Sequence, residues 1–424
     1  MAVNRLTKMT LLAENRHHDS LLKSLQRFQS VEIEDIFENQ ENQEWLEAYF
    51  PALEEVDQTK EQLYVQWLHQ IEKSIVFIRD NGSVKQKIKD LPRKSYTLNE
   101  LEARFNEEAL VSLLNQVAQL QKSWDENTKK LTYWQQAEDW ANQWLQYDVS
   151  PTEQLDSAKT VQAKVAAESW ETVETYLMEQ KDVYYELNYS SEKEIKFSFI
   201  ALNERAVTVQ AELITFGVSI EQNPYDESPA TLLPKAKKAL KECVETSKAL
   251  TSEIGYLKGQ VSILQLNEEV LLARLTRERA KEHLVLAKYL VVIRAWVNEE
   301  DQEQLMNQLQ KEHDQALFFS FESPTKEQIM ENKVPTKLRN NRFVSPFEIL
   351  TGMYSVPKYE EIDPTPWMAP FYLVFFGMMV ADLGYGFLTF IGTTLALKYL
   401  ILPRGTEKFV RLFQILSISI MIWG

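Results

Sequence analysis

One acidic residue stands inside a long apolar stretch near the end of the sequence. The stretch APFYLVFFGMMVADLGYGFLTFIGTTLAL begins at Ala369, and Asp382 lies in its middle. We predict one membrane span from about residue 368 to residue 397, in which this carboxylate must contact protein or water, because an ionised group is costly in hydrocarbon. Small residues that let neighbouring helices approach closely surround it: Gly377, Gly384 and Gly386. The pattern predicts a structural hydrogen bond from Asp382 to a later span or, alternatively, a site on an ion path.

A second apolar segment begins after the turn LPRG. The residues FVRLFQILSISIMIWG, from 409 to 424, start another span, and we expect further spans beyond them. Basic residues flank the first predicted span in similar numbers: Lys333, Lys337, Arg339, Arg342 and Lys358 precede it, and Lys398, Arg404, Lys408 and Arg411 follow it. The positive-inside comparison is therefore close to a tie. We expect a multi-pass membrane protein with a cytoplasmic N-terminal region, because the first residues do not resemble an export signal.

Other residue types that carry chemistry are scarce. The one cysteine, Cys243, falls on an apolar helical seam and is interpreted as a packed thiol, and the His17–His18 pair has no spaced metal-binding partner in sequence. The sequence contains no phosphate-binding loop and no GxSxG, HExxH or CxxC motif. We therefore predict no catalytic residue, no cofactor and no metal site. The net charge of −16 argues against nucleic-acid binding, because phosphates need a basic face.

Two long apolar seams predict the helices that carry much of the chain. From residue 110 to 145 and again from 233 to 275, seam residues recur at alternating steps of three and four. This spacing predicts an antiparallel coiled coil, because the chain must run out along one helix and return along the other. The central positions of the return seam are Leu250, Ile254, Leu257, Val261 and Leu264. Polar seam residues, such as Asn127 and Glu268, are expected to fix the register of the pair.

Alternating apolar residues predict two small α+β lobes at the ends of this rod. Strand, helix and strand are expected at 4–14, 15–30 and 31–37 and again at 287–297, 298–313 and 315–323. We predict that these two halves pair into one split lobe. Between residues 160 and 222, the order strand, helix, strand, strand, helix, strand predicts a ferredoxin-like lobe.

The predicted fold is therefore mainly α with two small α+β lobes. We expect a dumbbell made of a split βαβ-βαβ proximal lobe, a long antiparallel coiled coil and a ferredoxin-like distal lobe, followed by transmembrane helices. The predicted domains are 1–50 with 286–333 for the proximal lobe, 51–150 with 228–285 for the rod, 151–227 for the distal lobe, 334–367 for a linker that approaches the membrane, and 368–424 for the transmembrane region.

A long motif in the C-terminal part resembles a known family. The residues SPFEILTGMYSVPKYEEID (345–363) and DPTPWMAPFYLVFFGMMVADLGYG (363–386) resemble subunit I of V-type and archaeal-type rotary ATPases, called subunit a in eukaryotes. The predicted plan of lobe, rod and lobe is similar to the cytosolic domain of that family. Two departures stand out: Ala295-Trp296-Val297-Asn298 replaces a frequent Gly-Trp-Val-Pro, and Ala381 replaces a frequent glycine before the motif aspartate.

The resemblance implies a function for the chain. It implies the static subunit of a rotary motor that couples ATP hydrolysis or synthesis to H⁺ or Na⁺ translocation, non-catalytic by itself. It implies as partners the peripheral-stalk subunits, the membrane rotor ring, the lipid bilayer and, as a further candidate, the base of the central stalk. The ion half-channels would be formed beyond residue 424. From the residues alone, the alternative is a membrane-tethered coiled-coil scaffold or sensor that is unrelated to ion pumping.

Overall fold

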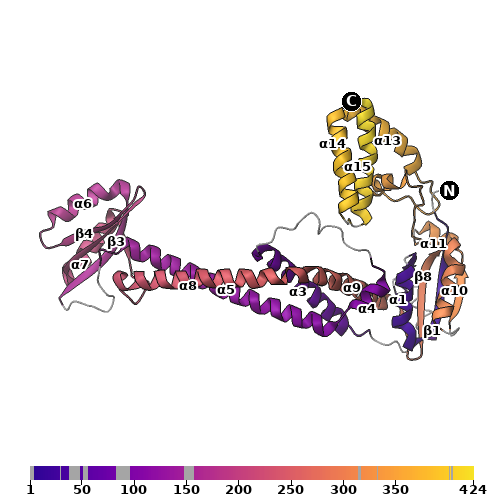
Figure 1. Ribbon diagram of the computed structural model, residues 1–424, viewed down its shortest axis with the longest axis horizontal. Helices are drawn as coiled ribbons and strands as arrows, with labels where there is room; N and C mark the ends of the chain where they lie inside the picture. Colours follow the sequence, from indigo (N-terminus) through magenta and orange to yellow (C-terminus); the bar gives the residue numbers. More distant parts are fainter. Residues whose placement is uncertain are drawn as a thin grey trace. The chain divides into compact units, whose positions relative to one another are not determined.

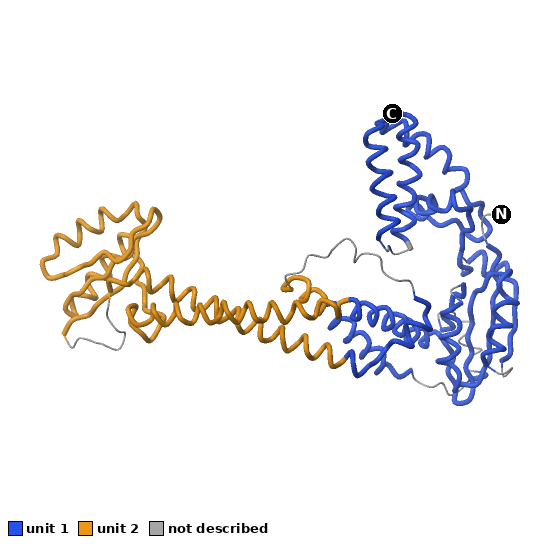
Figure 2. Tube along the Cα trace, viewed as in Figure 1, with its two compact units in different colours: residues 1–73, 85–110, 262–424 blue, residues 74–84, 111–261 orange. Residues whose placement is uncertain are grey.

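A computed structural model describes most of the chain. The described residues are 4–28, 30–37, 48–50, 56–82, 96–147, 157–313, 317–331, 333–400, 402 and 404–424. Residues 1–73, 85–110 and 262–424 form a first compact unit, and residues 74–84 and 111–261 form a second (Figure 2). The described residues are mainly helical and contain one antiparallel sheet in each unit (Figure 1). The predicted class, mainly α with two α+β regions, is confirmed at this level. The predicted domain limits at residues 51, 150 and 151 lie outside the described residues.

The sheet of the first unit combines strands from distant parts of the sequence. Its strands are β1 (Leu6–Glu14), β2 (Val31–Ile33), β7 (Val285–Leu286), β8 (Leu290–Asn298) and β9 (Phe318–Glu322), in the order β2-β8-β1-β9 with β7 beside β8. Strands β1 and β8 pair along their whole length, from Leu6 opposite Asn298 to Glu14 opposite Leu290. The first part of the strand predicted at 315–323 lies outside the described residues.

Two helices cover one face of this sheet. They are α1 (His18–Phe28) and α10 (Gln302–Glu312), and each follows a short 3₁₀ turn, η1 (Asn15–His17) or η6 (Glu299–Asp301). Met9, Leu11 and Ala13 alternate along β1 and point to the helices, because successive side chains of a strand point to opposite faces. They share one core with Leu21 of α1 and Leu305 of α10.

The second unit contains a sheet with the same topology. Its strands are β3 (Ala158–Ala166), β4 (Tyr184–Ser190), β5 (Glu194–Leu202) and β6 (Ser219–Glu221), in the order β4-β5-β3-β6, and helices α6 (Trp170–Glu179) and α7 (Asn203–Thr215) share its core. If β7 is left aside, both sheets place their strands in the order second, third, first, fourth. In the first sheet, residues 34–289 lie between the second strand and the third in the sequence.

Two long helices of the second unit lie antiparallel. Helix α8 (Pro229–Tyr256) runs beside α5 (Glu107–Gln143). Asn127 Nδ2 donates hydrogen bonds to Cys243 O at 3.1 Å and to Ser247 Oγ at 2.7 Å. Ala137 and Ala141, further along α5, pack with Leu232 and Ala236, which lie earlier in α8. The sequence numbers therefore rise along one helix where they fall along the other.

The return helix is interrupted where the sequence predicts an unbroken seam. Helix α8 ends at Tyr256, and the 3₁₀ turn η4 (Leu257–Gln260) separates it from α9 (Val261–Ala280). Gly255 lies in the last turn of α8, and Gly259 lies within η4. Glycine weakens a helix because it loses more backbone freedom on folding than other residues do. The prediction of one continuous helix is wrong at this point. Helices α3 (Thr59–Asn81) and α4 (Leu98–Arg104) complete the helical region.

The chain ends in three helices of the first unit. After α11 (Lys326–Met330), η7 (Ser345–Phe347) and α12 (Glu348–Tyr354) come α13 (Thr365–Val380), α14 (Leu383–Tyr399) and α15 (Arg404–Trp423). Ala369 of α13 shares a cluster with Leu412 and Leu416 of α15, and the later residue Gly377 lies against the later residues Ser419 and Trp423. These two helices therefore run in the same direction. Among the described residues, no helix combines the length and the apolar composition that crossing a membrane requires.

The single span predicted from residue 368 to residue 397 is wrong. Helix α13 ends before Ala381, which adopts a left-handed conformation with φ 34°. Asp382 then begins α14 as its N-cap, because its Oδ1 accepts a hydrogen bond from the backbone N–H of Tyr385 at 3.0 Å. Aspartate is a favoured N-cap residue, and hydropathy alone does not take this preference into account. Asp382 therefore lies at a turn between two helices and not in the middle of one.

Candidate functional site

Small residues set the distance between the three C-terminal helices. A Cβ on Gly377 of α13 would lie 3.0 Å from the carbonyl oxygen of Ser419 in α15. A Cβ on Gly386 of α14 would lie 2.7 Å from Cγ of Met421 and 3.1 Å from the carbonyl oxygen of Ser417. The Cβ on Gly377 would also lie 2.8 Å from Cδ1 of Trp423, and contacts below 3.0 Å force a neighbouring atom to shift. The close approach of α15 to both neighbours therefore depends on glycine at these two positions.

Side-chain hydrogen bonds also join α15 to its neighbours. Ser419 Oγ donates to the carbonyl oxygen of Leu373 in α13 at 2.7 Å, and Gln414 Nε2 donates to Thr394 Oγ1 in α14 at 2.9 Å. Ser417 and Ser419 are buried. Small polar residues of this kind are typical of helix contacts in lipid, where a polar group must find a partner within the protein.

The two other residues of the predicted packing set lie at the turn. Asp382 is exposed, and its hydrogen bond is made within α14. A Cβ on Gly384 would lie 3.3 Å from Asp382 Oδ1 and meets no other helix. The structure therefore separates Gly377 and Gly386, which lie at helix contacts, from Asp382 and Gly384, which shape the connection.

A polar network with a buried centre lies at the other end of these helices. Asn340 Nδ2 donates hydrogen bonds to Asp363 Oδ2 at 2.7 Å and to Glu348 Oε1 at 3.1 Å. Lys408, near the start of α15, forms an ion pair of 2.7 Å with Glu348 Oε2. Asp363 Oδ1 accepts the backbone N–H of Thr365, the first residue of α13, at 2.8 Å. These five residues are called the clamp below, because they join α12, α13, α15 and the segment before them.

The clamp is shielded from solvent at its centre. Asp363 is 2% exposed and Thr365 is 0% exposed, and Thr351 Oγ1 of α12 lies 2.7 Å from Thr365 Oγ1. Hydrogen bonds to a carboxylate are strong, and a buried carboxylate that loses them is costly. The relative placement of the three elements is therefore strongly determined.

The segment that carries Asn340, Glu348 and Asp363 of the clamp is fixed to the sheet of the same unit. The Tyr359 hydroxyl accepts the backbone N–H of Leu6 in β1 at 2.9 Å and lies 3.4 Å from its carbonyl oxygen. Arg339 Nη1 donates to both carboxylate oxygens of Glu300, at 2.6 and 2.7 Å. Leu6 also packs with Trp296 of β8 in a small apolar cluster. The sheet and the C-terminal helices are thus linked through residues 334–363.

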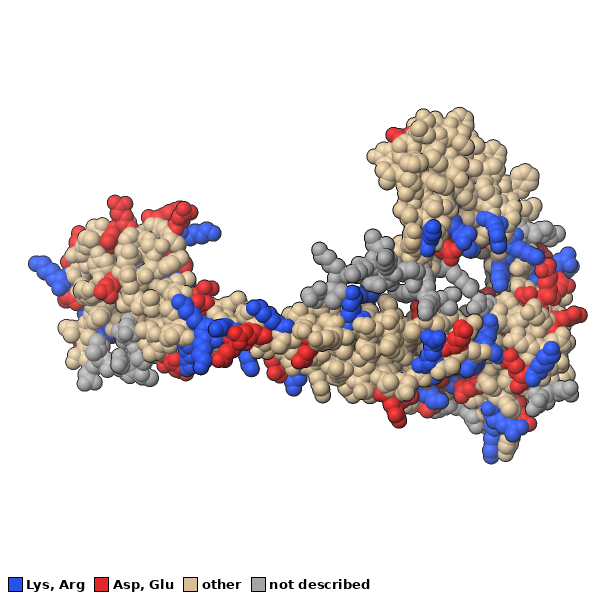
Figure 3. Space-filling model, in the orientation of Figure 1, with Lys and Arg blue, Asp and Glu red and all other residues tan. Residues whose placement is uncertain are grey.

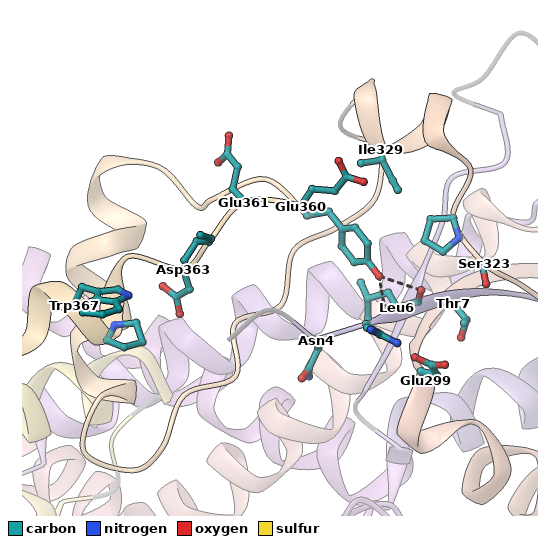
Figure 4. A pocket seen from close by; sticks show the side chains of 15 residues that line it. Asn4, Leu6, Thr7, Glu299, Ser323, Ile329, Glu360, Glu361, Asp363 and Trp367 are labelled. Carbon is teal, nitrogen blue, oxygen red and sulfur yellow. Dashed lines mark hydrogen bonds between the residues drawn. The ribbon is translucent and has the colours of Figure 1, made fainter. Parts of the chain in front are cut away.

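A groove of about 610 Å³ lies beside this link (Figure 4). Asn4, Leu6 and Glu299 contribute to one part of its wall, and Asp363 and Trp367 to another. Exposed carboxylates stand at its rim, including Glu360 and Glu361.

A charged cluster joins three helices of the first unit. Glu102 of α4 forms ion pairs with Lys23 of α1 at 2.5 Å and with Arg277 of α9 at 2.6 Å. Burial raises the pKa of the Glu102 carboxyl, but the hydrogen bonds and charges of Lys23 and Arg277 outweigh burial and hold that pKa below its usual 4.5. Glu102 is therefore ionised at neutral pH, and its ion pairs stabilise the contact between the helices.

The predicted seam residues occupy the helical region described above. Leu250, Ile254, Leu257 and Leu264 are buried and Val261 is half-buried. Leu257 and Val261 lie at the two ends of the 3₁₀ turn and not inside one helix. Cys243 is buried and is a free thiol.

Residues that could hold a metal do not gather in the described part of the chain. No group of three or more His, Cys, Asp or Glu side chains has a suitable arrangement there. The ring of His17 contacts the ring of His313, with centroids 6.0 Å apart, a pairing that no sequence pattern indicates.

The sequence does not predict the contacts of the clamp, although the motif quoted above contains Glu348, Asp363 and Thr365. One of its hydrogen bonds does have a local sequence signal. An aspartate two residues before the start of a helix typically accepts a backbone N–H there, as Asp363 does from Thr365. The partners Asn340, Glu348 and Lys408 carry no such local signal.

Comparison with known proteins gives a matching family model and several relatives. Residues 281–409 match the family model described as the V-type ATPase 116kDa subunit family. The chain is 32% identical over 233 residues to the A-type ATP synthase subunit I of Pyrococcus horikoshii, an alignment that covers 53% of this chain and 34% of that protein. It is 31% identical over 96 residues to the V-type ATP synthase subunit I of Chlamydia trachomatis, which covers 22% of this chain and 15% of that protein.

The relatives confirm the resemblance that the sequence motif indicates. The chain spans about a third of the length of the archaeal relative, since the alignment covers 34% of it. Among solved structures, the chain is similar to the cytoplasmic N-terminal domain of subunit I, a homologue of subunit a, of a V-ATPase, with a TM-score of 0.39 and 14% identity. That overlay covers 74% of this chain and 99% of the solved domain.

Proposed function

We propose that this chain, a relative of subunit I of the A-type and V-type ATP synthases, serves as the static subunit of a rotary ATPase. In this proposal the complex couples ATP hydrolysis or synthesis to H⁺ or Na⁺ translocation. The helices and lobes on the cytoplasmic side hold the peripheral stalks against torque, and the C-terminal helices stand in the membrane beside the rotor ring. The chain itself takes no part in the chemistry of ATP.

The clamp is the observation that supports this proposal best. A static subunit must transmit force between a water-exposed region and a membrane-embedded region through a rigid connection. Asn340, Glu348 and Lys408 join the start of α15 to the segment that reaches the sheet, and Tyr359 fixes that segment to β1. The region matched by the family model, residues 281–409, contains all four.

The surface of the C-terminal helices supports their placement in lipid. Met379 of α13 is 75% exposed, and Leu388 of α14 is 73% exposed. Further large apolar side chains on these helices are exposed, among them Phe371, Phe375, Phe387, Leu395 and Ile422. Soluble proteins rarely expose apolar patches of this extent, and such patches mark contacts with a membrane or with another protein. We propose that α13, α14 and α15 lie in the bilayer as part of a multi-pass protein.

Co-purification from membranes tests the proposed function. The full-length protein that contains this chain would be tagged, extracted in mild detergent and purified, and its companions identified by mass spectrometry. The proposal predicts rotor-ring and peripheral-stalk subunits in fixed ratio. Recovery of the protein without ATPase subunits, or with an unrelated partner, would favour the membrane-tethered scaffold instead.

A further inference from the structure

Basic residues that the sequence places on both sides of one span lie at one end of the C-terminal helices. Helix α14 returns beside α15, since Gln414 contacts Thr394 and Gly386 faces Met421. Lys398, near the end of α14, therefore lies at the same level as Lys408 and Arg411 in the first half of α15. The basic residues before and after the predicted single span therefore lie at the same end of the helices. For this reason, comparing their numbers does not give an orientation.

The turn before η7 adds a further cation to this end. Phe347 of η7 packs with Leu412 of α15, and its ring contacts Phe343, with centroids 6.1 Å apart. Arg342 precedes Phe343 and is exposed. Arg342, Lys398, Lys408 and Arg411 are called the basic collar below. In Figure 3 the C-terminal helices show a mostly uncharged surface, with Lys and Arg side chains gathered at one end.

Aromatic side chains occupy the same level as the basic collar. Trp367 in the first turn of α13 is 73% exposed, and Phe409 in α15 and Tyr399 at the end of α14 are also exposed. Exposed Trp and Tyr between an apolar surface and a charged one are typical of the headgroup level of a bilayer. The exposed apolar surface of the three helices continues from this level toward Asp382.

The charges of the collar are only partly neutralised by the protein. Lys408 pairs with Glu348, and Arg411 pairs with Glu407 at 2.7 Å. Among the described residues, Arg342 and Lys398 form no ion pair, and the Lys398 ammonium lies 5.6 Å from the centre of the Tyr399 ring. Two cations therefore face outward at a level where headgroups would lie, although the chain as a whole has a net charge of −16.

We infer that the basic collar binds the headgroups of anionic phospholipids, with Arg342 and Lys398 as its principal contacts. The inference rests on the proposed placement of the helices in lipid. It also sets their orientation, because the collar lies at the end that the clamp ties to the sheet, the cytoplasmic end in the proposed function. A lysine or arginine near an anionic membrane surface contributes about fivefold to binding, and salt weakens the effect.

Lipid binding to the full-length protein tests the inference. Native mass spectrometry would measure the affinity of the purified protein for phosphatidylglycerol and for phosphatidylcholine of the same chain length. The double variant Arg342→Gln, Lys398→Gln would be compared with a matched control, Lys237→Gln, Lys238→Gln, which removes two exposed cations from α8. The collar variant should lose on the order of 25-fold in affinity for phosphatidylglycerol, and the control should lose none.

Each outcome separates this inference from the proposed function. Equal affinity of the unaltered protein for the two lipids, or equal loss in both double variants, overturns the inference. Failure to retain either lipid contradicts the placement in the membrane itself. If the collar variant does not fold, the salt dependence of the unaltered protein decides, since the preference for phosphatidylglycerol must fall as salt is added.

Discussion

Asn127 in α5 donates a hydrogen bond of 2.7 Å to Ser247 in α8, although 120 positions separate the two residues. Asn127 is buried, and the same amide donates to the carbonyl oxygen of Cys243. A buried asparagine between paired helices specifies their register, because any shift leaves its amide without partners. This contact fixes how far α8 is displaced along α5.

Removal of this contact should expose the neighbouring cysteine. Asn127→Ala should lower the free energy of local opening by about 1–2 kcal/mol, because two hydrogen bonds are lost. The rate at which a thiol reagent modifies Cys243 would then rise by about 5- to 30-fold. Asn115→Ala, an exposed substitution in the same helix, is the matched control. Equal rates in the two variants would show that Asn127 does not hold the pair together.

The Glu102 cluster predicts a dependence of stability on pH. The pKa of Glu102 is lower in the folded protein than its usual 4.5, so its contribution to stability is complete above pH 4.5 and is lost as the pH falls through the lowered folded pKa. Glu102→Gln should cost on the order of 3 kcal/mol at neutral pH, because two partly buried cations lose their partner. Thermal unfolding at several pH values would measure the difference.

The difference between the unaltered protein and Glu102→Gln should shrink as the pH falls below 4.5 and through the lowered pKa of Glu102. Glu108→Gln, at an exposed glutamate in the first turn of α5, should show no such trend. A gap that stays constant with pH would mean that the charge of Glu102 is not what stabilises this contact.

Two glycines of the same helix should respond differently to alanine. Gly386→Ala places a Cβ 2.7 Å from Met421 Cγ and 3.0 Å from the Met421 nitrogen, so α15 must shift. We expect a loss of about 1–3 kcal/mol, typical of overpacking. Gly392→Ala meets nothing within 4 Å and should be neutral or slightly stabilising. Thermal stability of the protein in detergent would measure both, and similar melting temperatures would contradict the close contact of α14 with α15.

Asp382 should act as a helix cap. Asp382→Asn keeps a capping side chain, whereas Asp382→Ala should cost about 1 kcal/mol and speed hydrogen exchange at the first turn of α14 by about fivefold. In the assembled complex, Asp382→Asn should leave ion transport near normal. Complete loss of transport in an assembled Asp382→Asn complex would instead support the alternative, a site on an ion path.

The paired strands and the two helical seams follow from the sequence for a physical reason. Alternation in β1 and steps of three and four in α8 each place apolar side chains on one face, and such a face must be buried. Met9, Leu11 and Ala13 obey the first pattern, and Leu250 and Ile254 obey the second. Patterns of this kind are local, so a single sequence contains them.

The helix break at Ala381 could not be seen in apolar content. A hydropathy sum adds the free energy of transferring each residue into lipid. In such a sum, Asp382 is an unfavourable residue inside one span, and nothing indicates that a new helix starts there. The break depends on a left-handed Ala381 and on a hydrogen bond to the Tyr385 backbone, both of which are conformational. The break at η4 is hidden from the sequence pattern for a similar reason. Glycine weakens the helix there, but the apolar seam residues keep their spacing of three and four.

The clamp could not be derived from the sequence because its contacts are distant. Lys408 lies 60 positions after Glu348, and Asn340 precedes Asp363 by 23. No spacing rule relates polar residues over such separations. Their proximity follows from the return of α14, which brings the start of α15 back beside the start of α13.

The most direct test of the account measures how many ions the complex moves for each ATP that it hydrolyses. The full complex would be purified with Asn340→Ala or with the control Asn115→Ala and reconstituted into vesicles. Asn340→Ala removes the amide that joins Glu348 to Asp363, so ATP hydrolysis should continue while the ions moved per ATP fall, and the control should match the unaltered complex. An assembled Asn340→Ala complex with an unchanged ratio would contradict the claim that the clamp transmits torque to the membrane.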